Sequence, residues 1–316
     1  MMTALLLVLL FASVGAIVWG AEMFAEHLGP VAKYLGTSTV ALAVLLAGAE
    51  PEELATAVMA SVRHSPAIAL GDVIGANVTM CLVALGLGAV IAPLPFRGSA
   101  LLYALIGLPL ASVGTYLAWD AKVSRGAGAA LILLYVAYVA SIWVIEKRPP
   151  ALGEMRELNE TRGRKNQPMR DVLLVFAGLV AMVLGATALV ESVRRLAHVE
   201  ASQTFLGLTV VGFATGFELV ALAWSASRRG TPEIVVAGVV GSFAYNMTMT
   251  LGAAALARPL ILVDASSLHK PLIAMMGSFA FIVLLALARG RISRFAGGLL
   301  LAAYPLTIWF AFLKRS

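Results

Sequence analysis

Four glutamates lie inside long apolar segments, where charged residues are rare. They are Glu50, Glu52, Glu53 and Glu218. The first three occur in LLAGAEPEELATAVMAS, within an apolar stretch over residues 36–62, and the fourth occurs in VVGFATGFELVALAWSAS, within 203–227. A carboxylate at that depth in a bilayer is costly, and no Lys or Arg lies in the central portion of either stretch. The missing partner is therefore expected to be a bound cation.

A proline lies between two of these glutamates. Pro51 removes one backbone hydrogen bond and displaces the carbonyl group of the preceding turn. Together with Gly48 it predicts a broken or kinked helix whose freed carbonyl oxygens can ligate an ion. In the second stretch Phe217 takes the place of the proline, and only Gly212 and Gly216 make the helix backbone more flexible. The break there is therefore expected to be weaker.

The next apolar segment of each half offers neutral donors. GDVIGANVTM begins at Gly71 and AGVVGSFAYN begins at Ala237. Their shared glycines, Gly75 and Gly241, allow close approach between helices, whether for plain packing or for a site. The side-chain oxygens nearby belong to Asn77, Thr79, Ser242 and Asn246. These groups suit either cation binding or hydrogen bonds across helices.

Elsewhere charge is scarce. Of 316 residues, 60% are apolar and 13% are charged, against about a quarter charged in soluble domains, which excludes a soluble globule. Apolar stretches of about 20 residues can cross a bilayer. The expected spans are 4–26, 36–62, 67–93, 97–119, 126–146, 171–192, 203–227, 232–256, 270–289 and 293–313. The basic residues lie singly or in pairs, so lipid and inorganic cations are the expected partners and nucleic acid is not. The oligomeric state is left open.

The two halves of the chain are related. A shift of 166 residues aligns 52–89 with 218–255 without a gap, and thirteen of the thirty-eight pairs are identical, including Glu52 with Glu218. The segment 147–170 joins a first half, 1–146, to a second half, 171–316. Five spans per half is an odd number, so the second copy enters the membrane from the opposite side. The predicted fold is an all-α polytopic membrane protein with about ten helices in two inverted five-helix repeats.

Basic residues set the expected orientation. Loops on the side of the central segment carry fourteen Lys and Arg residues, and those on the opposite side carry nine. The central loop is therefore expected in the cytoplasm and both termini outside, in the plasma (inner) membrane. Without that loop the count is seven to nine, so the orientation depends on one segment.

These motifs resemble a known family. A glutamate within small residues, preceded by Pro51 in the first half and by Phe217 in the second, is followed about two dozen residues later by a motif of glycines, a small residue and Asn. This pattern resembles the alpha repeats of the calcium/cation antiporter superfamily, which includes the sodium/calcium exchangers. The resemblance implies a secondary antiporter that exchanges Ca²⁺ for Na⁺ or H⁺, with no cofactor and no enzymatic activity. By likeness, Glu52 and Glu218 are the paired ion-binding acids, Ser242 is the repeat serine, and Asn246 is the downstream ligand.

The chain departs from the family pattern at several ligand positions. Apolar residues or glycine replace the first repeat's hydroxyl and amide groups at Gly48, Ala49, Ala76 and Met80. In the second repeat, Thr215 or Ala214 stands where the hydroxyl pair would be. The first half has gained Glu50, Glu53 and Asp72 instead. Ca²⁺ takes six to eight oxygens. The full expected ligand set is therefore Glu52, Glu218, Ser242, Asn246, Thr215, Glu53, Glu50, Asp72 and Asn77, completed by carbonyl groups or water.

One register question stays open in the sequence. The internal repeat selects Glu52 as the partner of Glu218, whereas the shorter motif spacing common in relatives selects Glu53. Adjacent residues of a helix point about 100° apart, so only one of them can face Glu218 unless a kink rotates them. We favour Glu52, because the gap-free repeat is evidence from this chain itself.

Two other functional classes remain open to comparison with this sequence. The missing hydroxyl groups also suit a cation channel or a non-transporting membrane scaffold on the same fold. An intramembrane enzyme is disfavoured, because no Ser/His or Cys/His pair occurs at membrane depth and the four histidines lie near the ends of apolar spans.

Overall fold

The computed structural model describes residues 2–34, 50–146 and 168–312. In these ranges, nine helical segments are long and apolar enough to cross a membrane. The tenth expected span, 36–62, lies partly outside the described residues, and its described part is a helix that begins at Pro51. The first helix is longer than the expected 4–26 and runs from Met2 to Tyr34.

The helices of the first half follow the expected order. They are α1 (Met2–Tyr34), α3 (Pro51–Val62), α4 (Pro66–Thr79), α5 (Leu85–Ile91), α6 (Ser99–Trp119) and α7 (Arg125–Glu146). A π-helical turn, Met80–Ala84, joins α4 to α5, so the two form one continuous span.

The second half repeats this series. Its helices are α9 (Pro168–Leu196), α10 (Glu200–Leu206), α11 (Gly212–Thr215), α12 (Phe217–Arg228), α13 (Glu233–Tyr245), α14 (Leu251–Ala257), α15 (Ser266–Arg289) and α16 (Arg294–Phe312). Two further π-helical turns lie at Gly207–Val211 and Asn246–Thr250. The shift of 166 residues seen in the sequence maps α3 onto α12, the π-helical turn after α4 onto the turn after α13, and α5 onto α14.

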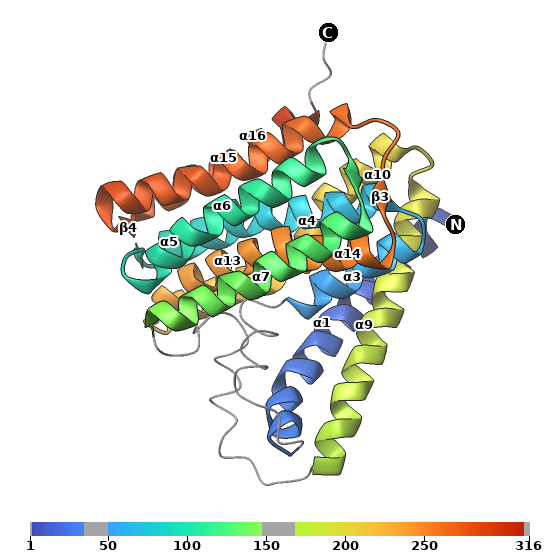
Figure 1. Cartoon of the computed structure of the whole chain (residues 1–316), viewed down its shortest axis with the longest axis horizontal. Coiled ribbons are helices and arrows are strands. Elements are labelled where there is room, and N and C mark those ends of the chain that lie inside the picture. Colours follow the sequence, from blue (N-terminus) through green and yellow to red (C-terminus); the bar gives the residue numbers. More distant parts are fainter. Residues whose placement is uncertain (1, 35–49, 147–167, 313–316) are drawn as a thin grey trace.

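Two short strand pairs tie the halves together. β1 (Leu94–Pro95) pairs antiparallel with β4 (Arg291–Ile292), and β2 (Lys122–Val123) pairs antiparallel with β3 (Leu260–Ile261). The β1–β4 and β2–β3 pairs lie at opposite ends of the helix bundle (Figure 1). Helix α6 therefore runs from the β1 end to the β2 end, whereas its equivalent, α15, runs from β3 back to β4. Equivalent helices run in opposite directions, as an inverted repeat requires.

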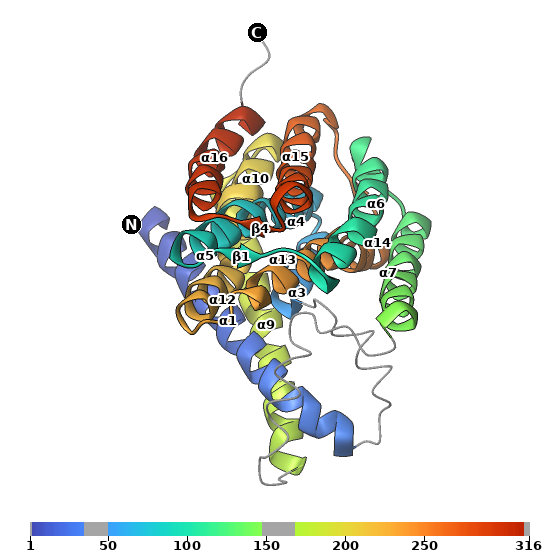
Figure 2. The ribbon, with the colours of Figure 1, turned by 90° about the vertical axis from the view of Figure 1, so that its left-hand side faces the viewer.

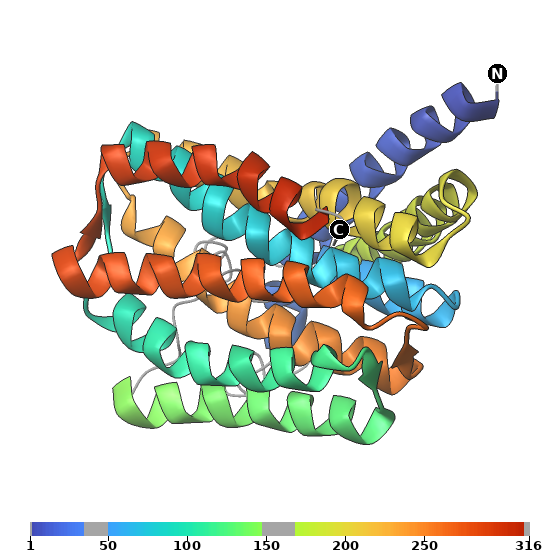
Figure 3. The ribbon, with the colours of Figure 1, turned by 90° about the horizontal axis from the view of Figure 1, so that it is seen from above.

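The core consists of two equivalent spans. The windows within Pro66–Ile91 and Glu233–Ala257 are 78% and 83% buried, against 44% or less for the other candidate spans in the described residues. In the view from above, the remaining helices are arranged around these central spans (Figure 3). The polar residues Asp72, Asn77 and Ser242 on these spans are consequently fully buried.

Backbones come into direct contact where α4 crosses the segment before α12. A methyl group on Gly75 would lie 2.1 Å from the carbonyl oxygen of Leu208, and one on Gly212 would lie 2.5 Å from the amide nitrogen of Ala76. Only glycine lacks the Cβ atom that would collide there. The small-residue motif of α4 thus allows the two halves to meet at van der Waals distance.

Helices α1 and α9 form an inclined pair beside the bundle (Figures 1 and 2). They pack through glycines: a methyl group on Gly20 would lie 2.7 Å from the carbonyl oxygen of Gly178. Near the C-terminal end of α1, His27 Nδ1 lies 2.9 Å from Asp171 Oδ1 of α9, and both side chains are buried. This contact joins the two helices at the end nearest the central segment.

Candidate cation site

The start of α3 places three glutamates close together. Pro51 occupies the first helical position, where its missing amide hydrogen removes no helical bond. Glu50 precedes it with a non-helical backbone (φ −121°, ψ 89°), and Glu52 and Glu53 lie in the first turn. Pro51 therefore marks a helix start, and Gly48 lies outside the described residues.

The second half contains the break that its glycines predict. Gly216 separates α11 from α12 with φ −74° and ψ 0°, so Glu218 lies in the first turn of α12. The equivalent acids of the two halves, Glu52 and Glu218, thus both lie in the first turn of a helix. In a bilayer such interruptions occur where the backbone faces protein or a water-filled cavity.

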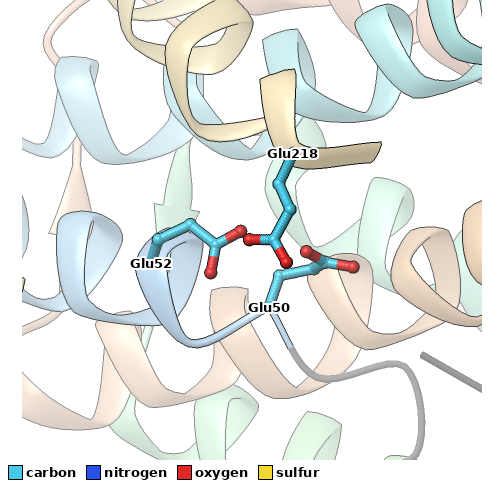
Figure 4. Close-up of side chains that lie close together, drawn as sticks. All are labelled: Glu50, Glu52 and Glu218. Atoms are coloured by element: carbon cyan, nitrogen blue, oxygen red, sulfur yellow. The ribbon is translucent and has the colours of Figure 1, made fainter. Parts of the chain in front are cut away.

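Three carboxylates converge at this point. Glu50, Glu52 and Glu218 each offer an oxygen, and these oxygens all lie within 4.8 Å of one another. The carboxylates of Glu52 and Glu218 point toward each other from α3 and α12, and that of Glu50 comes from the segment before α3 (Figure 4). Glu52 is fully buried, Glu50 is 5% exposed and Glu218 is half-buried.

Two of these acids, Glu52 and Glu218, lack a compensating charge among the described residues. In the ranges that the structure describes, no Lys or Arg forms an ion pair with Glu52 or Glu218. Both oxygens of Glu52 and one of Glu218 also have no hydrogen-bond partner among the described residues. Unpaired buried carboxylates repel one another strongly at low dielectric constant. A cation placed between them would relieve both the desolvation and the repulsion.

Neutral side chains of the second half contact polar groups of the first. Ser242 Oγ donates a hydrogen bond to Glu50 Oε1, and Thr215 Oγ1 donates to Asp72 Oδ1 at 2.8 Å. Asn246 Nδ2 donates to Asn77 Oδ1 at 3.2 Å. All six residues are buried. The site is therefore built across the interface between the halves.

Glu53 is not one of the three converging acids. It is 1% exposed, and its electrostatic neighbours are Glu50, Asp72, Glu218 and the amide of Asn246. The second oxygen of Asp72 has no hydrogen-bond partner in the described ranges. The structure thus brings Glu52 beside Glu218, and the ligand role of each acid stays a prediction.

A match to a known family accompanies this geometry. The sequence model described as "Sodium/calcium exchanger protein" matches residues 5–144 and 171–313. The chain belongs to this family. As expected from the resemblance, it is a multi-pass membrane protein related to cation exchangers rather than to enzymes.

One relative and two solved structures match nearly the whole chain. The sodium/calcium exchanger MaX1 of Methanosarcina acetivorans is 25% identical, over 96% of this chain and 97% of its own length. The sodium-calcium exchanger NCX_Mj is similar in structure, with a TM-score of 0.61, 20% identity, and coverage of 99% of this chain and 100% of that chain. The H⁺/Ca²⁺ exchanger CAX gives a TM-score of 0.76 at 15% identity, covering 96% and 82%. The predicted all-α polytopic fold is confirmed.

One acidic residue near the site escaped the sequence analysis. Glu22 of α1 lies within electrostatic range of Glu218. The sequence feature that could have identified Glu22 is its position inside the first apolar span, which also contains Glu26. No repeat supports it, because the equivalent residue of the second half is Thr187.

The bond between Thr215 and Asp72 gives a testable stability effect. Thr215→Val removes the hydroxyl group but keeps the shape, which leaves Asp72 without its hydrogen-bond donor in a fully buried position. Leaving one buried polar group unsatisfied costs about 1–3 kcal/mol. We expect a lower melting temperature of the purified protein in detergent, with partial recovery in Thr215→Val/Asp72→Asn.

Thr209→Val is the matched control. The Thr209 hydroxyl donates to the carbonyl oxygen of Phe205 in its own helix, at 2.6 Å. Its loss should change the melting temperature little. Equal effects of the two substitutions would contradict a specific role for the contact between Thr215 and Asp72.

Proposed function

We propose that this chain is a secondary antiporter that exchanges Ca²⁺ for Na⁺ or H⁺ by alternating access, with the cation held between Glu52 and Glu218. The observation that carries the proposal is the convergence of Glu50, Glu52 and Glu218 within 4.8 Å at a buried interface. No other cluster of three or more potential metal-binding His, Cys, Asp or Glu side chains is found in the described residues.

The chemistry of these groups suits a hard cation. Ca²⁺ binds six to eight oxygens, and three carboxylates can each provide one or two of them. The Ser242 hydroxyl, which contacts Glu50, is a further oxygen at the same place. Oxygen ligands without His or Cys favour Ca²⁺ over zinc or copper.

Competition for one site accounts for exchange. When the acids are ionised, the site attracts a dication. When monovalent cations or protons are bound instead, they neutralise the negative charge of the same carboxylates. The two classes of ion therefore exclude each other from the site. Binding on one side of the membrane and release on the other then couples their movements.

The fold offers a route to alternating access. The acids come from inverted halves, so a relative movement of the halves exposes the site first to one side and then to the other. Helices α1 and α9, which pack mainly against each other, are the expected moving pair. We place the central loop in the cytoplasm, both termini outside, and the protein in the plasma (inner) membrane.

Ion flux in reconstituted vesicles tests the proposal. ⁴⁵Ca²⁺ uptake is followed under an outward Na⁺ gradient, then under a pH gradient, and then with neither. Antiport predicts uptake above that of protein-free vesicles with one of the gradients and its loss when that gradient is dissipated by an ionophore. Uptake insensitive to both gradients would overturn antiport in favour of a channel, and absence of uptake would favour a non-transporting scaffold.

A further inference from the structure

Glu22 is a carboxylate at membrane depth that the candidate site does not use. It lies on α1 inside the candidate span Leu6–Leu28 and its side chain is exposed. Residues 6–21 of this span carry no charge. Exposed carboxylates within spans are costly against lipid and are found instead where they face a water-filled path or the protein interior.

Its surroundings indicate which of these applies. The Glu22 carboxylate is within electrostatic range of Glu218, although the two residues come from α1 and α12. Helix α1 also contacts α3 and α11, which flank the cluster of acids. One carboxylate oxygen of Glu218 has no hydrogen-bond partner in the described residues. Glu22 is therefore near enough to the cluster of acids to line an approach to it.

The depth of Glu22 assigns this approach to one side of the membrane. At 1.5 Å per residue, Glu22 lies about 9 Å from the Leu28 end of the span and about 24 Å from the Leu6 end. Glu26 follows one turn later on the same face, and His27 and Asp171 join α1 to α9 at that end. This is the end nearest the central segment.

The second half has no acid at the position equivalent to Glu22. At the position equivalent to Glu22 is Thr187, whose hydroxyl donates to the Val183 carbonyl oxygen in its own helix. At the position equivalent to Glu26 is Glu191, which pairs with Arg195 at 2.8 Å and with Arg194 at 3.6 Å. The carboxylate of Glu22 is therefore present on only one side of the pseudosymmetric site.

We propose that Glu22 lines the route by which cations reach the candidate site from the central-loop side, and that it raises their local concentration there. A carboxylate beside a path with low-dielectric walls attracts cations over several ångströms. Apparent affinity for Ca²⁺ then differs between the two sides, although one site serves both. This inference rests on the proposed antiport and deepens it by assigning a sided access residue.

Sided transport kinetics of Glu22→Gln test the proposal. In vesicles sorted by orientation, through a protease site in the central segment, we expect the half-saturating Ca²⁺ concentration on the central-loop side to rise about fivefold at low ionic strength. The value on the opposite side and the maximal rate should stay unchanged, and the effect should shrink at high salt. Glu191→Gln, at the equivalent of Glu26, should change neither side. A shift on both sides, or on neither, would overturn the proposal.

Cysteine accessibility gives a measurement that needs no transport. The one native cysteine, Cys81, is fully buried, so a new thiol can be read with little background. Glu22→Cys should react with a membrane-impermeant methanethiosulfonate from the central-loop side only, and Ca²⁺ should slow the reaction. Phe11→Cys, on the same face about three turns earlier and on a residue that is 73% exposed, should stay unlabelled in lipid.

The two measurements separate the two ideas. If vesicles show no gradient-driven uptake while Glu22→Cys is labelled from one side and protected by Ca²⁺, antiport fails and the access route stands. If uptake is gradient-driven while Glu22→Cys is unlabelled from the central-loop side, the access route fails and antiport stands.

Discussion

Replacing Glu52 or Glu218 by Gln is expected to reduce gradient-driven Ca²⁺ uptake to the background of protein-free vesicles. Each substitution keeps the shape of the side chain and removes one negative charge from a cluster whose oxygens lie within 4.8 Å of one another. Removing one partner of a buried charge pair costs about 3–5 kcal/mol. That corresponds to more than about a hundredfold in affinity for the cation. ⁴⁵Ca²⁺ flux and isothermal titration with Ca²⁺ measure the two consequences separately.

Glu53→Gln and Glu233→Gln are the controls for this prediction. Glu53 adjoins Glu52 but is not among the three converging acids, so its loss should reduce uptake less than the loss of Glu52. Glu233 lies exposed in the first turn of α13, and its replacement should leave uptake unchanged. Full activity in both Glu52→Gln and Glu218→Gln would exclude the paired-acid site. A loss with Glu53→Gln but not with Glu52→Gln would move the site to the other register.

The repeat made much of the fold predictable. The gap-free shift of 166 residues in the sequence recurs in the bounds of α3 and α12, of α5 and α14, and of the π-helical turns before α5 and α14. The helix of the first-half acids begins at Pro51, where a proline fits because the first helical position needs no amide hydrogen bond. Local residue types were enough to predict these helix bounds, because the bounds depend on the covalent chain and on backbone hydrogen bonds within each helix.

Local sequence patterns could not predict the contacts between the halves. Thr215 and Asp72, or Ser242 and Glu50, are more than 140 residues apart, and only the crossing of α4 and α13 with the opposite half brings them together. Their repeat equivalents gave no clue, because Gly238 stands opposite Asp72 and Gly216 opposite Glu50. Glu22 was missed for the same reason: its importance depends on a neighbour from α12 that sequence spacing does not show.

Gly75→Ala is expected to destabilise the protein severely, because the added methyl group would lie 2.1 Å from the carbonyl oxygen of Leu208. That oxygen belongs to the backbone, so no side-chain rotation relieves the overlap, and α4 must move away from the opposite half. Overpacking of this kind costs about 1–3 kcal/mol or more, beyond the modest gain from replacing glycine by alanine within a helix. Melting temperature in detergent and the yield of monodisperse protein measure the loss.

Gly277→Ala and Gly298→Ala make this prediction specific. Both glycines are helical, in α15 and α16, and an added methyl group would have no neighbour within 4 Å. These variants should be as stable as the wild type or slightly more stable, because alanine favours helix. The sign of the change thus separates close backbone approach from helix propensity.

Since α4 also carries Asp72 and Asn77, a Gly75→Ala protein that still folds should bind Ca²⁺ more weakly. An unchanged melting temperature in Gly75→Ala would contradict direct backbone contact between the halves at the candidate site.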